Sequence, residues 1–180
     1  FNVRAGILHS PLNDTGGEVR YLAQISDEPG LLAEYYQPFG LRGRWFFGAR
    51  AQYENRKINV FDGAGNRTSE YDASQIGLSL NGGREFGNYG AAMAGLRRYT
   101  GNARVEIGDP SLPEDDYDIG EAFVEGSIDR LDSAYLPRSG YLLRLRYTRS
   151  LEALGADSDF AQVDFDGISG WSFGKHSLQA

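Results

Sequence analysis

Long segments in which apolar and polar residues alternate recur along the whole sequence, and this period of two constrains the fold more than any other feature. The stretch SGYLLRLRYTRS places Leu143, Leu145 and Tyr147 at alternate positions, with Arg144 and Arg146 between them. A β-strand sends successive side chains to opposite faces of its sheet, whereas a helix needs a repeat of about 3.6 residues. Such alternation is typical of an antiparallel sheet with one apolar and one polar face. We therefore predict an all-β fold.

Ten segments of this kind can be traced between turn-forming residues. The 24 glycines and 6 prolines fit a chain of many strands separated by turns. We predict strands over residues 1–8, 18–25, 31–39, 44–61, 71–83, 90–107, 119–129, 139–150 and 159–174, with a tenth beginning at His176. The longest connections are expected to be polar loops over residues 59–70 and 108–118.

Composition removes several classes of protein. The formal net charge of -7 argues against nucleic-acid binding, because neutralising phosphates requires an excess of Lys and Arg. The chain has no cysteine, so disulfides and thiolate metal sites are excluded. No window approaches the ~18 consecutive apolar residues of a transmembrane helix, which leaves a membrane barrel as the transmembrane fold still open.

Three further features favour a transmembrane β-barrel over a soluble β protein. The segments are about as long as the ~9 to 11 residues with which a tilted strand crosses a bilayer. Short turns alternate with longer acidic loops, as they do on the two sides of outer-membrane barrels. Aromatic residues gather near segment ends, where an interfacial girdle would lie. They are Tyr35, Tyr36, Trp45, Phe46, Phe47, Tyr135, Tyr141, Trp171 and Phe173. A soluble barrel or sandwich that binds a small ligand remains the alternative from another class.

The hairpin around LEALGADSD predicts both faces of the sheet at once. If its strands pair about Gly155, residues whose numbers sum to 310 lie opposite each other. This register sets Arg144 opposite Asp166 and Arg146 opposite Asp164, as a charge ladder in the lumen. The residues predicted to face lipid are Leu143, Leu145, Tyr147, Val163 and Phe165. Salt bridges on the wet face of a soluble sheet would give the same pattern.

The segment SIDRLDSAYLPRSGYLLRLRYTRS resembles the signature of the bacterial surface antigen family, the outer-membrane barrels that include BamA, TamA and two-partner secretion transporters. In that family an Asp-rich strand end precedes a turn with an aromatic residue, Pro and Gly, and a new strand follows. The matching positions are Asp129, Asp132, Tyr135, Leu136, Pro137, Ser139 and Gly140. Leu136 departs from the phenylalanine that the family usually carries there.

A second stretch, GGEVRYLAQISDEPGLLAEYYQPF, resembles the subgroup in which the barrel follows a patatin-like phospholipase domain and a small periplasmic domain of the POTRA type. The matching residues are Gly16, Gly17, Glu18, Glu34, Tyr35, Tyr36, Gln37 and Pro38. The resemblance implies a barrel that anchors or exports an attached acyl-ester hydrolase, whose catalytic domain would lie outside this chain. An assembly or translocation factor of the BamA and TamA type is the alternative among membrane proteins.

The same resemblance implies how the chain is organised and where it works. Family barrels have sixteen strands, so we expect residues 1–180 to form a single partial barrel domain of about ten strands. The chain starts at Phe1 without an initiator Met, and we interpret it as a fragment that lacks the last strands. We expect it in the bacterial outer membrane. Expected partners are outer-membrane lipid and lipopolysaccharide, upstream periplasmic and enzymatic domains of the same polypeptide, and other barrels, but not nucleic acid.

No motif in the sequence indicates catalysis, a cofactor or a metal. In GISGW, Trp171 occupies the position of the second glycine that a nucleophile elbow around Ser169 would need. His9 and His176 have no carboxylate at a motif spacing. The acidic run at residues 114–118 does not match a calcium-binding loop, so we expect a solvated loop there. Whether the parent protein is an enzyme is left open.

Overall fold

The fold is one antiparallel sheet of ten strands. The computed structural model describes residues 1–40, 43–109, 111–133 and 135–179. Each strand pairs with the next one along the chain, so the order across the sheet is β1 to β10 without a crossover. The strands are β1 (Asn2–His9), β2 (Glu18–Ser26), β3 (Gly30–Phe39), β4 (Trp45–Phe61), β5 (Arg67–Glu85), β6 (Gly90–Ile107), β7 (Asp115–Asp129), β8 (Gly140–Ser150), β9 (Phe160–Phe173) and β10 (His176–Gln179). The prediction of an all-β, up-and-down fold is confirmed.

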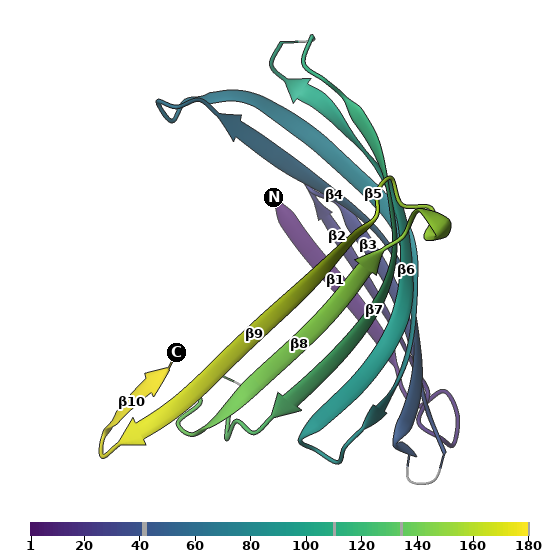
Figure 1. Ribbon diagram of the computed structural model, residues 1–180, viewed down its shortest axis with the longest axis vertical. Helices are drawn as coiled ribbons and strands as arrows, with labels where there is room; N and C mark the ends of the chain where they lie inside the picture. The colour runs from purple at the N-terminus through teal and green to yellow at the C-terminus, as the bar shows by residue number, and fades with distance from the viewer. Residues whose placement is uncertain (41–42, 110, 134, 180) are drawn as a thin grey trace.

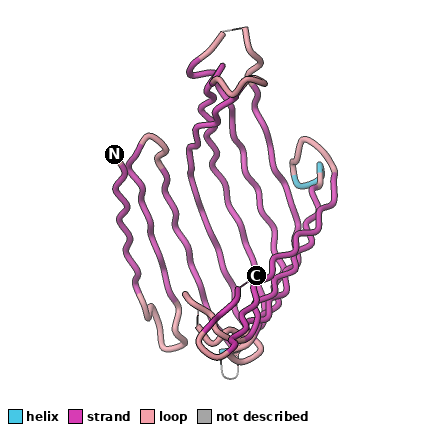
Figure 2. The backbone as a smooth tube through the Cα atoms, turned by 90° about the vertical axis from the view of Figure 1, so that its left-hand side faces the viewer, coloured by secondary structure: helices cyan, strands magenta, loops and turns pink. Residues whose placement is uncertain are grey.

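The sheet is rolled into a trough (Figure 1), and Figure 2 looks into its hollow side. We call the hollow side the concave face and the outer side the convex face. β1 and β10 are the two edges of the sheet and do not pair with each other over the residues that the structure describes. A short 3₁₀ turn, η2 (Glu152–Leu154), projects from the convex side (Figure 1). Within the described ranges, no helix has the length and apolar character needed to cross a membrane.

Alternation assigns each strand residue to one face, because residues directly opposite each other in paired strands share a face. One polar row runs across β2 to β8 through Arg20, Glu34, Arg50, Ser79, Arg97, Glu121 and Ser150. The adjacent row on the other face is apolar and runs through Val19, Tyr35, Ala49, Leu80, Leu96 and Ala122. Gly120 shares the face of Ala122, and a Cβ there would lie 2.3 Å from the carbonyl oxygen of Leu154 in η2. The apolar face is therefore the convex one.

Rolling the sheet crowds the concave face and spreads the side chains of the convex face. On β7, the concave residues Glu121 and Phe123 are only 5% and 7% exposed. The convex residue Leu145 is 54% exposed. Crowding also explains a glycine of the concave face, since a Cβ on Gly77 would lie 2.1 Å from Cδ1 of Tyr99. The best-packed layer of the molecule is thus its mixed charged and aromatic side.

The predicted loop over residues 59–70 is shorter in the structure. β5 begins at Arg67, so the turn after β4 is confined to residues 62–66. The Asp62 carboxylate accepts the N–H groups of Ala64 and Asn66, each at 2.9 Å, and this closes a tight turn. The strand extensions are polar, so apolar alternation does not mark them.

The predicted acidic loop over residues 108–118 is also shorter, because β7 already begins at Asp115. Asp116 forms an ion pair with Arg104 of β6, which lies close to it across the hairpin. Opposite charges on neighbouring strands support pairing where no apolar contact is available. Part of the run expected to be a solvated loop is therefore strand.

The loop after β8 replaces a strand along the edge of β7. β7 and β8 pair as far as Glu121 and Ser150, and β7 continues beyond that point. There the N–H of Leu151 donates to the carbonyl oxygen of Gly120 at 2.9 Å. The N–H of Asp157 donates to the carbonyl oxygen of Asp118 at 3.1 Å. The loop therefore continues the hydrogen-bonded ladder where β8 has ended.

Candidate functional site on the barrel wall

Ion pairs join neighbouring strands along the polar row of the concave face. Glu34 of β3 pairs with Arg20 of β2 and with Arg50 of β4. Arg97 of β6 pairs with Glu121 of β7, whose side chain is only 6% exposed. Burying a carboxylate is costly unless a cation and hydrogen bonds compensate it. These pairs therefore make the charged residues part of the packing between strands.

The residues of the predicted ladder have the predicted register. Arg144 lies opposite Asp166, and Arg146 lies opposite Asp164. Their ion-pair partner is another residue, Glu125 of β7, whose carboxylate lies 2.6 Å from Nη2 of Arg146 and 3.6 Å from Nε of Arg144. The expected Arg–Asp ion pairs do not form between the described residues of β8 and β9.

The arginines pair with Glu125 rather than with the two aspartates for a geometric reason. Glu125 lies directly opposite Arg146 on the other side of β8, and its side chain is one methylene longer than that of aspartate. It is 8% exposed, so it gains more from a guanidinium than the less buried Asp164 does. The Arg146 guanidinium also lies 4.9 Å from the centroid of the Phe123 ring. The alternation in IGEAFVEGSID contains the signal, because Glu121 and Glu125 have the same parity and therefore lie on the face that Arg144 and Arg146 share once β7 pairs with β8.

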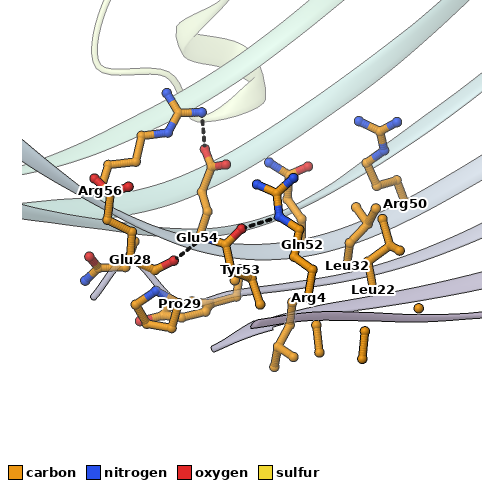
Figure 3. A pocket seen from close by; sticks show the side chains of 17 residues that line it. Arg4, Leu22, Glu28, Pro29, Leu32, Arg50, Gln52, Tyr53, Glu54 and Arg56 are labelled. Atoms are coloured by element: carbon orange, nitrogen blue, oxygen red, sulfur yellow. Dashed lines mark hydrogen bonds and ion pairs between the residues drawn. The ribbon is translucent and has the colours of Figure 1, made fainter. Parts of the chain in front are cut away.

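A recess with a mixed polar and apolar lining lies on the concave face over β1 to β4, with a volume of about 550 Å³. Figure 3 shows Arg4, Arg50 and Arg56 directed into this recess. Nε of Arg4 donates to Oε1 of Gln24 at 2.6 Å. Nη2 of Arg56 lies 3.0 Å from the Glu54 carboxylate. Each of these arginines thus has an acceptor within the wall, as expected for a hydrated lining.

The five residues predicted to face lipid lie on the convex face and are between 36% and 67% exposed. They are Leu143, Leu145, Tyr147, Val163 and Phe165. The apolar surface continues across the sheet in Ile76, Leu78, Leu80, Leu96 and Val124, each at least 50% exposed. A continuous apolar face of this extent marks a surface that meets an apolar environment.

The predicted aromatic girdle is divided between the two faces. Trp45, Tyr141 and Trp171 lie on the convex face, near the end of the sheet that is opposite η2. Phe46 and Tyr36 instead lie on the concave face, where their ring centroids are 5.6 Å apart. Adjacent residues of one strand cannot share a face, so the run of aromatics at residues 45–47 had to divide.

The residues of the family turn motif form the connection between β7 and β8. Oδ1 of Asp132 accepts the N–H of Arg138 at 2.8 Å and that of Ser139 at 3.1 Å. These backbone donors, first Ser139 and then Arg138, lower the pKa of the Asp132 carboxyl below its ordinary value. Oδ1 of Asp129 accepts the N–H of Leu131 at 3.0 Å. The two aspartates of the motif therefore organise the backbone of the turn.

The remaining motif residues differ in what they contact. Gly140 has φ +99°, and a Cβ there would lie 2.0 Å from the carbonyl oxygen of Arg130, so glycine is required. Pro137 is buried. Tyr135 and Leu136 project outward and are 93% and 72% exposed. Leucine in place of the family's phenylalanine at position 136 thus leaves the described turn intact.

Residues considered for catalysis or metal binding lie in structural positions. Ser169 is within β9, opposite Tyr141 of β8. Asp118 pairs with Arg98, with 3.0 Å between Oδ2 and Nη2. Over the described ranges, His, Asp and Glu form no group of three or more that is able to hold a metal ion.

The architecture first defines a class: a rolled antiparallel sheet with an apolar convex face and an ion-paired concave face is the wall of a membrane β-barrel. The chain belongs to the Omp85 superfamily, since residues 13–180 match the model of the Omp85 superfamily domain. The predicted outer-membrane barrel of the BamA and TamA kind is confirmed at this level.

The fold is also found among solved structures. The chain is similar to BamA from Haemophilus ducreyi, in a crystal structure that lacks POTRA domains 1–3, with a TM-score of 0.77 and 14% sequence identity. The match covers 97% of this chain and 35% of that one. No curated protein matches the sequence.

Proposed function

We propose that the chain forms part of the wall of a barrel that assembles or translocates proteins in the bacterial outer membrane. The observation that carries this proposal is that a sheet of the Omp85 superfamily has an apolar, exposed convex face and an ion-paired concave face. Lipid would solvate the convex face through residues such as Leu145 and Phe165. The concave face would border a hydrated lumen. A soluble ligand-binding barrel is disfavoured, because its convex face would have to be polar.

The concave face fits such a lumen because its charges are balanced within the wall. Glu125, Arg144 and Arg146 form one cluster, and Arg97 with Glu121 forms another. Paired side chains leave a polar surface without a large field of one sign, which a passing polypeptide tolerates better than an apolar lining. In this proposal Asp164 and Asp166 are lumen residues with capacity for further hydrogen bonds.

The second candidate function is to anchor or export an attached patatin-like phospholipase domain. The sequence resemblance of residues 16–38 favours it. These residues form the end of the β1–β2 turn, then β2 and most of β3. The barrel itself would then be a passive anchor, and acyl-ester hydrolysis would take place in another part of the polypeptide.

Reconstitution of the full-length protein in phospholipid vesicles separates the two functions. We expect it to accelerate the folding of an added, urea-unfolded outer-membrane barrel by at least about tenfold over empty vesicles. Release of fatty acid from the vesicles without such acceleration would instead favour the phospholipase anchor. A protein that stays monodisperse without detergent and does not enter vesicles would contradict both.

A further inference from the structure

An unusual arginine lies on the convex face, near the end of the wall that carries the β7–β8 turn. Gly83 points to the concave side, where a Cβ would meet Phe46 and Met93, so its neighbour Arg84 points to the convex side. The Arg84 guanidinium lies 5.4 Å from the ring centroid of Trp45 and 5.5 Å from that of Phe86. Two aromatic rings thus hold this cation beside the apolar part of the convex face.

Arg84 has no acidic partner among the residues that the structure describes. None of their ion pairs includes it. Its Nε is buried and has no hydrogen-bond partner there. Arg98, also on the convex face, differs because it pairs with Asp118. An unpaired cation at the margin of an apolar face needs a counter-charge from its surroundings.

A second arginine at the same end of the wall also contacts an aromatic ring. Arg130, the first residue after β7, lies 4.4 Å from the ring centroid of Tyr89 in the turn between β5 and β6. It too takes part in none of the ion pairs of the described residues. Tyr89 also accepts the N–H of Asp129 at its carbonyl oxygen, at 2.8 Å, which ties the two turns together.

The convex face beside Arg84 carries small residues. Ala92 of β6 lies opposite Arg84, and Gly126 of β7 lies opposite Ala92. A Cβ at Gly126 would meet no atom within 4 Å, so the surface there is open. Leu145 of β8 lies opposite Gly126. Because these side chains are small, the surface next to the guanidinium is open to an acyl chain.

We propose that Arg84 binds the phosphate of an anionic phospholipid, with one acyl chain packed against Ala92 and Gly126. The proposal rests on the proposed function, in which the convex face meets lipid. A guanidinium offers several N–H donors in a plane that matches two phosphate oxygens, and it remains charged at any physiological pH. Tryptophans such as Trp45 are enriched at the membrane interface, where lipid phosphates lie.

Quenching of Trp45 fluorescence measures this binding. The chain has two tryptophans, so Trp171→Phe makes Trp45 the sole reporter. The full-length protein in this background, with any tryptophan outside residues 1–180 also replaced, is titrated in detergent with phosphatidylglycerol or phosphatidylcholine brominated near the glycerol. We expect phosphatidylglycerol to quench at about fivefold lower concentration, since one cationic side chain near a membrane contributes about that factor. Arg84→Gln should abolish the preference, whereas the matched control Arg144→Gln removes a concave-face charge and should keep it.

Each outcome bears on one statement. Equal quenching by both lipids, or a preference that survives Arg84→Gln in folded protein, would overturn the headgroup site. Absence of quenching by either lipid would contradict the proposed membrane contact of the convex face itself. Folding of each variant is checked by the heat-dependent shift in electrophoretic mobility that folded outer-membrane barrels show. If Arg84→Gln fails to fold, Arg84→Lys is measured in its place. It keeps the charge and should therefore retain part of the preference for phosphatidylglycerol.

Discussion

The concave face of the sheet buries charged residues, whereas the convex face leaves apolar residues exposed. On the concave face Glu121 and Glu125 are almost inaccessible, whereas Val163 and Phe165 on the convex face are 65% and 67% exposed. A soluble antiparallel sheet has the reverse distribution, with its apolar face covered and its charges in water. Stability of the concave face therefore depends on matched charges, and stability of the convex face depends on the medium around it.

The largest expected effect is a charge placed on the convex face. Leu145→Arg should destabilise the folded protein in a bilayer by about 2 to 4 kcal/mol if residue 145 lies near the midplane. Unfolding by urea in lipid vesicles measures the change, with Leu145→Ala as the control that adds no charge. Equal losses for the two variants would contradict a lipid-facing position.

The next effect is the loss of a matched charge on the concave face. Glu125→Gln leaves Arg144 and Arg146 without their carboxylate and should cost about 1 to 3 kcal/mol in the same assay. Asp164→Asn, which removes an equal charge from a less buried site, should stay within about 0.5 kcal/mol. Similar costs for both would mean that Asp164 is the partner of Arg146 in the bilayer.

The turn between β7 and β8, which lies outside the apolar region, should make the stability of the fold depend on pH. Because the folded pKa of Asp132 is lowered, its carboxylate stabilises the fold above the unfolded pKa, near 3.9, and this contribution is lost as pH falls through the lower folded value. Asp132→Asn should therefore lower the urea midpoint at pH 6 and make it less dependent on pH below about 4. An unchanged pH profile between pH 4 and pH 2 would refute the assignment.

The smallest effect is expected for an exposed ion pair of the recess. The Arg56 side chain is 69% exposed, and its pair with Glu54 lies within one strand. Arg56→Gln should change the free energy of unfolding by no more than about 0.5 kcal/mol. A loss as large as that of Glu125→Gln would show that the recess is closed off from water in the complete barrel.

The sequence was sufficient for the strands, their order and the β8–β9 register. Two independent patterns, the Arg and Asp positions and the Leu, Tyr, Val and Phe positions, agree on that register, and a shift by one residue would break both. The strand extensions at residues 67–70 and 115–118 were missed, because their pairing depends on charge matching and turn chemistry rather than on apolar alternation.

The sequence could not predict which residues, far apart along the chain, form ion pairs or cation–π contacts with each other. The pairing of Arg146 with Glu125 depends on which of two neighbouring strands offers the longer and more buried carboxylate. The stacking of Arg84 between Trp45 and Phe86 joins β4, β5 and the following turn. Alternation assigns residues to faces, but it does not rank the contacts within a face.

The loop after β8 has a consequence for how the chain avoids self-association. Backbone groups on a bare strand edge recruit strands from other molecules. By bonding to Gly120 and Asp118, Leu151 and Asp157 occupy the part of the β7 edge that β8 leaves uncovered. The loop is in this respect a protective cap, so an insertion between β8 and β9 is better tolerated at the tip of η2 than at either of these two residues.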